Sequence, residues 1–132
     1  MAKKHSFLAT LALSLLLLAH TERARADSPY DPFADQYLAT GFNTALDAYQ
    51  ADPSDPDAYD AALYGYYAQY YASVADNEDD QVAWYYASLY GNYAADFALA
   101  SYEATGNVGS YYAYYYLSTG ATYAYYAYVT FA

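Results

Sequence analysis

A stripe of small residues recurs along this chain about every 26 residues. Within each occurrence the steps from one stripe position to the next are four, three, four and three. These steps are typical of a seam on one face of an α-helix, so the pattern predicts four helices in related register. The stripes are Ala34, Leu38, Gly41, Ala45 and Ala48; Ala61, Gly65, Ala68, Ala72 and Ala75; Ala87, Gly91, Ala94, Ala98 and Ser101; and Ala113, Leu117, Gly120, Ala124 and Ala127.

Aromatic residues repeat in register with this stripe. A seam of alanine and glycine lets two helices approach closely, but it buries little area. A tyrosine ring buries about 150–250 Å², so rings beside the seam can supply the missing core. We expect Tyr64, Tyr90 and Tyr116 to fill hollows left by the small stripe of a neighbouring helix. Phe97 takes the place that Tyr71 and Tyr123 hold in sister units, which indicates that the ring matters there more than the hydroxyl.

The repeat, together with the residues expected to begin and end each helix, predicts helices over residues 32–50, 56–75, 79–105 and 110–131. Asp31-Pro32 and Asp55-Pro56 each place a capping carboxylate before a proline at the first helical position. The expected connections are residues 51–57, 76–80 and 105–110. The predicted fold is all-α, either a four-helix up-down bundle or a short helical repeat array.

The last segment leaves two alternatives open. Tyrosine and threonine favour strands, and Ser118-Thr119-Gly120 could turn a hairpin between residues 111–117 and 121–131. Residues 111–132 carry no charge, as a membrane span would, but polar phenol groups suit a headgroup region better than a bilayer centre. Because the small stripe is complete here, a helix is the favoured interpretation.

Polar residues at helical spacing predict one water-facing stripe on the first helix and one on the third. The first consists of Gln36, Thr40, Asn43, Asp47 and Gln50, and the second of Gln81, Ser88, Asn92, Asp96 and Glu103.

The N-terminal residues have the pattern of an export signal. Lys3 and Lys4 precede an apolar run of 13 residues, from Phe7 to Ala19, and Ala24-Arg25-Ala26 fits a cleavage site. An uncleaved anchor is the less favoured reading, because a span needs about 20 apolar residues. We therefore expect a signal peptide over 1–26, a mature domain over 27–132, and a secreted, periplasmic or cell-surface location.

Cleavage would leave an acidic chain without basic side chains. All four Lys and Arg residues, both histidines and one of the 15 acidic residues lie in the first 26 residues, and there is no cysteine. The mature chain would keep 14 carboxylates and all 23 tyrosines. This composition argues against nucleic acid and anionic lipid as partners. It also excludes catalytic arrangements that need His, Cys or Lys, so no enzyme activity and no cofactor is expected. Asp96 and Glu103 could form a carboxylate pair, but a solvated helix face explains them more simply.

Two acidic stretches are weak candidates for calcium ligands, because calcium takes six to eight oxygens. Neither has the order of a known calcium loop, and capping of helix N-termini explains several of these acids more simply. The candidates are Asp52, Asp55, Asp57, Asp76, Glu78, Asp79 and Asp80.

The remaining tyrosines exceed what one helix face can bury, and exposed aromatic patches often mark contact sites. The predicted interaction surface is Tyr66, Tyr70, Tyr114, Tyr115, Tyr125, Tyr126 and Tyr128. We therefore expect a non-catalytic structural or interaction component of the cell envelope or exterior, which self-associates or docks on an envelope polymer or protein. The alternative is an acidic binding module for calcium or cationic partners. Oxidative cross-linking of tyrosines is permitted by the composition, but the order of residues favours packing.

Overall fold

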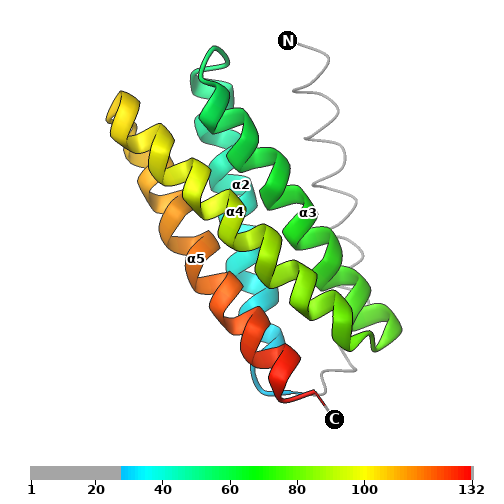
Figure 1. Ribbon diagram of the computed structural model, residues 1–132. Helices are drawn as coiled ribbons and strands as arrows, with labels where there is room; N and C mark the ends of the chain where they lie inside the picture. The colour runs from blue at the N-terminus through cyan, green and yellow to red at the C-terminus, as the bar shows by residue number, and fades with distance from the viewer. Residues whose placement is uncertain (1–27, 132) are drawn as a thin grey trace.

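The protein folds as four α-helices joined by short turns (Figure 1). The structure is a computed structural model and describes residues 28–131; the predicted signal peptide lies outside these residues. The helices are α2 (Asp31–Ala51), α3 (Pro56–Glu78), α4 (Gln81–Thr105) and α5 (Val108–Val129). The described residues contain no strand, so the hairpin alternative for the last segment is wrong and the helix is confirmed.

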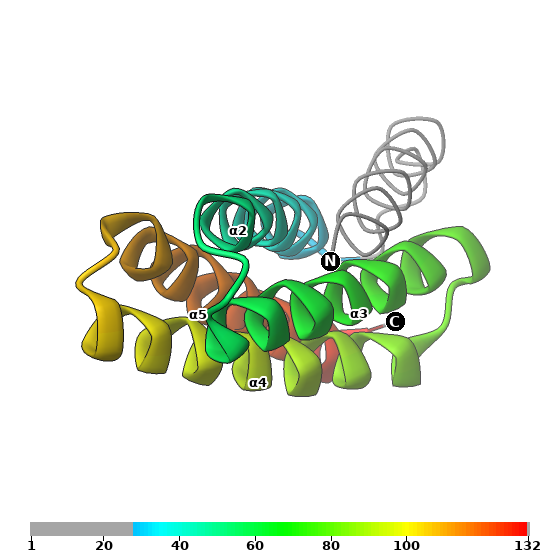
Figure 2. The same cartoon turned by 90° about the horizontal axis from the view of Figure 1, so that it is seen from above.

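The helices run up and down and close into a bundle. Each helix packs against the next along the chain, and α2 also packs against α5. Figure 2 shows α2 lying across the layer that α3, α4 and α5 form. The contact between the first and last helices distinguishes this bundle from an open repeat array. None of the helices in residues 28–131 is both long and apolar enough to cross a membrane.

The helix ends follow the capping chemistry of the sequence with two corrections. Asp55 caps α3 by accepting a hydrogen bond from the Asp57 backbone N–H at 3.0 Å, as predicted. Asp31, however, is the first residue of α2 and not its cap. The connection expected over residues 76–80 is also shorter in the structure, because α3 continues to Glu78 and Asp80 caps α4. Asp79 ends α3 in the left-handed region, with φ of 50°.

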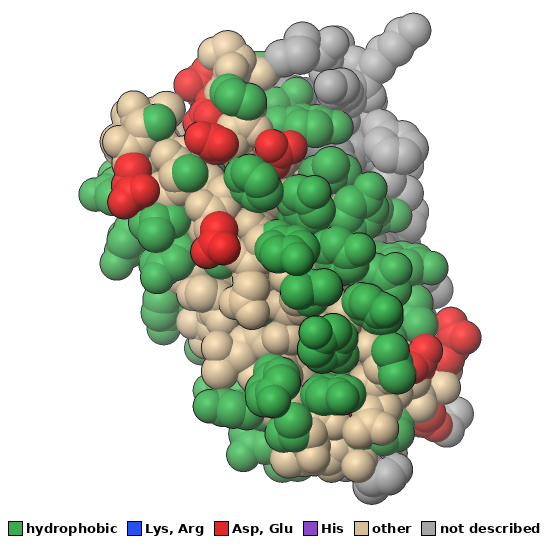
Figure 3. Space-filling model, in the orientation of Figure 1, with side chains coloured by type: hydrophobic (Ala, Val, Ile, Leu, Met, Phe, Trp, Pro, Cys, Tyr) green, Lys and Arg blue, Asp and Glu red, His purple; other side chains and the backbone are tan. Residues whose placement is uncertain are grey.

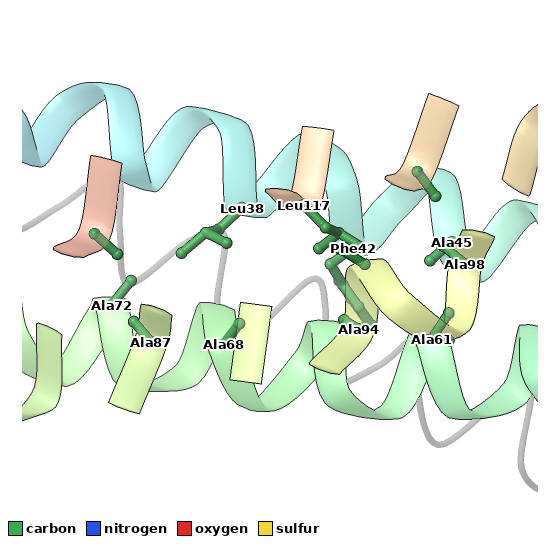
Figure 4. Packing of buried hydrophobic residues seen from close by; sticks show 14 of the residues in the cluster. Leu38, Phe42, Ala45, Ala61, Ala68, Ala72, Ala87, Ala94, Ala98 and Leu117 are labelled. Atoms are coloured by element: carbon green, nitrogen blue, oxygen red, sulfur yellow. The ribbon is translucent and has the colours of Figure 1, made fainter. Parts of the chain in front are cut away.

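All twenty positions of the small stripe are buried. They face the bundle axis from all four helices, with Phe42 and the fully buried Trp84 adding larger side chains. Figure 4 shows Leu38, Phe42 and Leu117 between the helices, with alanines of the stripes around them. The sequence therefore predicted the inner face of every helix correctly.

Leucines, and not tyrosines, occupy the hollows at Gly41 and Gly120. A Cβ added to Gly41 would lie 2.7 Å from Cγ of Leu117, and one added to Gly120 would lie 2.9 Å from Cγ of Leu38. The exchange is reciprocal, since each leucine lies where the other helix has its glycine. Leu38 also lies 3.2 Å from a Cβ placed on Gly91. The expectation that Tyr64, Tyr90 and Tyr116 fill such hollows is not met at the glycines, where no tyrosine atom is among the nearest neighbours; Tyr64 and Tyr90 are partly buried and pack against the core.

A buried hydrogen-bond chain ties the α2–α3 turn to the other two helices. Ser101 Oγ of α4 donates to Asp55 Oδ2 at 2.6 Å and lies 2.8 Å from Ser110 Oγ of α5. Asp55 is 8% exposed, so its carboxylate is held between its own helix cap and this chain. At the opposite end Gln81 Nε2 donates to the Tyr128 carbonyl at 3.0 Å.

The water-facing stripes are confirmed except at two positions, Asn43 and Ser88. On α2 the polar stripe is exposed apart from Asn43, which is partly buried. On α4, Ser88 is only 6% exposed, whereas Gln81, Asn92, Asp96 and Glu103 are exposed. Ser88 directly follows the seam residue Ala87 and belongs to the edge of the buried face.

Candidate functional site

A stack of aromatic rings fills the outer groove between α3 and α4. Rings from the two helices alternate: Phe97 on Tyr64 at 5.6 Å and 4°, and Tyr64 on Tyr90 at 6.0 Å and 13°. Tyr90 then stacks on Tyr71 at 5.6 Å and 7°, and Tyr71 contacts Tyr86 at 5.4 Å. Offset stacking at 4.5–7 Å is a favourable geometry for aromatic pairs. We call these five residues the α3/α4 ladder.

The groove between α2 and α5 holds a shorter version of the same stack. Tyr116 contacts Tyr37 at 6.2 Å and 36°, Tyr37 stacks on Tyr123 at 5.7 Å and 21°, and Tyr123 stacks on Phe33 at 5.4 Å. Each ring stands at the same position of the repeat as its counterpart in the first ladder. The position of Phe97 is taken by Thr44, so this α2/α5 ladder lacks its end ring.

On α2 and α5, threonine also stands at the positions of the two rings that flank the α3/α4 ladder. Tyr67 and Tyr93 meet Tyr64 edge to face, at 6.0 Å and 5.8 Å. The corresponding positions on α5 and α2 are Thr119 and Thr40. The two grooves therefore share one register but differ in aromatic content.

Burial within the ladder affects the ionisation of Tyr90. Its pKa is raised by burial first, and then by repulsion from Tyr71 and Tyr64. Burial likewise raises the pKa of Tyr49 and Tyr66, with smaller contributions from neighbouring tyrosines. These phenols favour their neutral form in the fold, which suits a packing role and opposes a phenolate role at neutral pH.

The exposed tyrosines gather on α4 and α5. Of ten exposed tyrosines among the described residues, nine lie on these two helices and Tyr70 lies on α3. Figure 3 shows apolar side chains spread over this side of the molecule, with most acidic side chains toward its two ends. The α4–α5 tyrosine surface consists of Tyr85, Tyr86, Tyr93, Tyr102, Tyr111, Tyr112, Tyr115, Tyr125 and Tyr126.

The seven tyrosines selected from the sequence overlap this surface only in part. Tyr115, Tyr125 and Tyr126 belong to this surface, and Tyr70 is exposed on α3. The other three tyrosines are partly buried: Tyr66, Tyr114 and Tyr128. The exposed rings of α4 were missed. A signal existed: Tyr85 precedes its seam residue by two positions, which is about 200° around a helix and points away from the core.

The acidic candidates are distributed over two turns and act mainly at helix ends. No three acidic side chains in residues 28–131 come together as a metal ion would require. Asp52 accepts a hydrogen bond from Ser54 at 2.7 Å, and Asp80 accepts one from the Ala83 backbone N–H at 3.2 Å. Asp76 is buried and Glu78 is exposed. Asp96 and Glu103 are both exposed on α4.

Comparisons of the chain with protein-family models, with curated proteins and with solved structures give no match.

Proposed function

We propose that this protein is a non-catalytic structural component of the cell envelope or exterior that self-associates through the α4–α5 tyrosine surface. The observation that carries this proposal is the concentration of exposed tyrosines on two adjacent helices. Tyrosine offers a large, rigid contact area at low entropic cost, and aromatic residues are enriched where proteins meet.

The charge distribution supports contact between copies at this surface. Acidic residues are few on α4 and α5: Asp96 and Glu103 are the only ones within the two helices. Two copies could therefore meet along the rings while their acidic turns stay apart. Since the described residues contain no Lys, Arg or His, repulsion between copies should be screened by salt.

Sedimentation of residues 27–132 over a dilution series tests the proposal. We expect the average mass to rise with protein concentration, and to rise further with added salt. Replacing Tyr112, Tyr115 and Tyr125 together by serine should weaken association at least tenfold, as expected for loss of an interface centre.

Tyr70→Ser is the matched control, because Tyr70 is equally an exposed helical tyrosine but lies on α3. It should leave association unchanged, and circular dichroism should show that both variants keep their helices. A monomer at every concentration, or equal weakening by the control, would contradict the proposal.

A further inference from the structure

A small cavity lies beside the turn between α2 and α3, away from the α4–α5 tyrosine surface. Its volume is about 280 Å³. Pockets that enclose drug-sized ligands measure about 300–1,000 Å³, so this cavity lies just below that range and suits a small ligand group. It is lined by Tyr49, Pro53, Ser54, Asp55, Pro56, Tyr59 and Asp60.

The walls of this cavity are held by a turn and by a contact between two rings. The Asp55 backbone N–H donates to the Asp52 carbonyl at 3.2 Å, which closes a turn with Pro53 at its second position. Tyr49 and Tyr59 meet edge to face at 5.2 Å, and Tyr49 is 1% exposed. The cavity is thus pre-formed by a proline turn and by two interlocked rings.

The two carboxylates in the lining differ in availability. Asp55 already accepts hydrogen bonds on both oxygens, from the Asp57 backbone N–H and from Ser101. Asp60 has no such bond among the described residues, and it is partly buried. Burial, and then repulsion from Asp57, raise the pKa of Asp60, so its negative charge is poorly compensated.

The repeat singles out Asp60 as well. It precedes the seam residue Ala61 by one position, and the other three helices carry Phe33, Tyr86 and Tyr112 there. The α3 helix therefore has an acidic residue at a repeat position where the other three helices have an aromatic residue. Nothing in the packing of the ladders requires this exchange.

We propose that this cavity binds an organic cation, an alkylammonium or guanidinium group, through the Asp60 carboxylate and the ring of Tyr59, which the buried Tyr49 ring supports edge to face. A carboxylate beside aromatic walls is the combination that recognises such groups, since the charge pairs with the acid and the cation attracts the ring faces. Calcium is not the expected occupant, because no three acidic side chains in residues 28–131 come together as a metal ion would require. The inference goes beyond the proposed self-association and does not depend on it, because no residue of the cavity belongs to the α4–α5 surface.

Titration of ¹⁵N-labelled residues 27–132 with n-butylammonium, followed by NMR, tests this site. We expect saturable shifts at residues 49–60, and none with n-butanol, which has the same chain without the charge. Asp60→Asn should weaken binding at least tenfold. Asp47→Asn removes the same charge from an exposed position outside the cavity and should change the affinity less than twofold.

Two further arms complete the experiment. Tyr59→Leu should weaken butylammonium binding while keeping the apolar wall, and calcium should give no saturable shift at residues 49–60. An acetylated Gly-Lys-Gly amide binding ten times more tightly than butylammonium would indicate a protein partner, and equal affinity a free amine. Absence of saturation, equal binding of butanol, or equal effects of the Asp60 and Asp47 variants would overturn the proposal.

Discussion

The α2/α5 pair and the α3/α4 pair are built on one repeat, but they differ in their seam residues and in the length of their outer ring stacks. In α2 and α5 the seam reads leucine and then glycine three residues later, as in Leu38 and Gly41. In α3 and α4 the same positions read glycine and then alanine, as in Gly65 and Ala68. The first pair therefore has a leucine on its seam where the second has glycine, and the second pair has the longer outer ladder.

This difference shows how a core can be filled from a sequence poor in large aliphatic residues. Two leucines placed opposite glycines, Leu38 and Leu117, fill the bundle centre, and Leu38 also approaches Gly91 of α4. The α3 and α4 helices keep a seam of alanine and glycine, which allows close approach but buries little area. The rings of the α3/α4 ladder then supply apolar contact outside the seam.

The largest test removes the central ring of each ladder. Tyr90 contacts the rings of Tyr64, Tyr67, Tyr71 and Tyr93, whereas Tyr37 contacts those of Tyr116 and Tyr123. At about 0.5–1.5 kcal/mol for each ring pair, Tyr90→Ala should cost about 2–6 kcal/mol and Tyr37→Ala about 1–3 kcal/mol. Urea unfolding of residues 27–132 measures both. Equal costs would mean that the two ladders contribute alike.

The second test adds a methyl group on the inner face. Gly41→Ala and Gly120→Ala place a Cβ within 3.0 Å of both a leucine side chain and that leucine's backbone nitrogen. We expect each to destabilise the fold by about 1–3 kcal/mol, because the backbone cannot move aside cheaply. Gly65→Ala is the contrast, since its nearest neighbour would be 3.4 Å away. It should stabilise the helix by about 0.5–1 kcal/mol, and a loss there would contradict the comparison of the two seams.

The sequence predicted the seams because they depend only on local periodicity. Spacings of four and three identify the buried face of a helix whatever packs against it, and every stripe position is buried. The same regularity predicted that the fourth segment is a helix, although its tyrosines and threonines favour strands.

The roles of the tyrosines could not be predicted in the same way, because they depend on which helices are neighbours. Tyr64 and Tyr90 stack only because α3 and α4 are antiparallel neighbours, which brings like positions of the repeat together. Their partial exposure follows from lying beside the seam and not on it. Asp60 was missed for a related reason: its cavity forms between the α2–α3 turn and the start of α3.

The third test completes the shorter ladder. Thr44→Phe supplies the ring that Phe97 provides in the other groove, and should stabilise the fold by about 0.5–1.5 kcal/mol. Tyr116 should then turn toward the parallel geometry of Tyr64 and Tyr90. Phe97→Thr should cost a similar amount, and the double exchange should nearly cancel. Thr122→Phe, at an exposed position of α5, should change the stability little; a gain as large as that of Thr44→Phe would indicate a general effect of added apolar surface.

The smallest effect concerns the pH dependence that the complete ladder should confer. The pKa of Tyr90 is raised in the fold, chiefly by burial, so the folded state holds the phenol proton more tightly than the unfolded chain does. The stability from this difference is present below the unfolded value of about 10 and is lost as pH rises through the folded value. Tyr90→Phe keeps the ring and removes the proton, so it should reduce the loss of stability between pH 9 and 12.

Thermal unfolding across this pH range, compared with Tyr112→Phe, separates the ladder from the surface. Tyr112 is 52% exposed and lies outside both ladders, so its replacement should leave the alkaline slope as it is. If both variants flatten the slope equally, the alkaline loss comes from the total charge of the tyrosines and not from the α3/α4 ladder. If only Tyr90→Phe does so, ionisation within the stack is what opens this groove, as expected for helices held together by their outer rings.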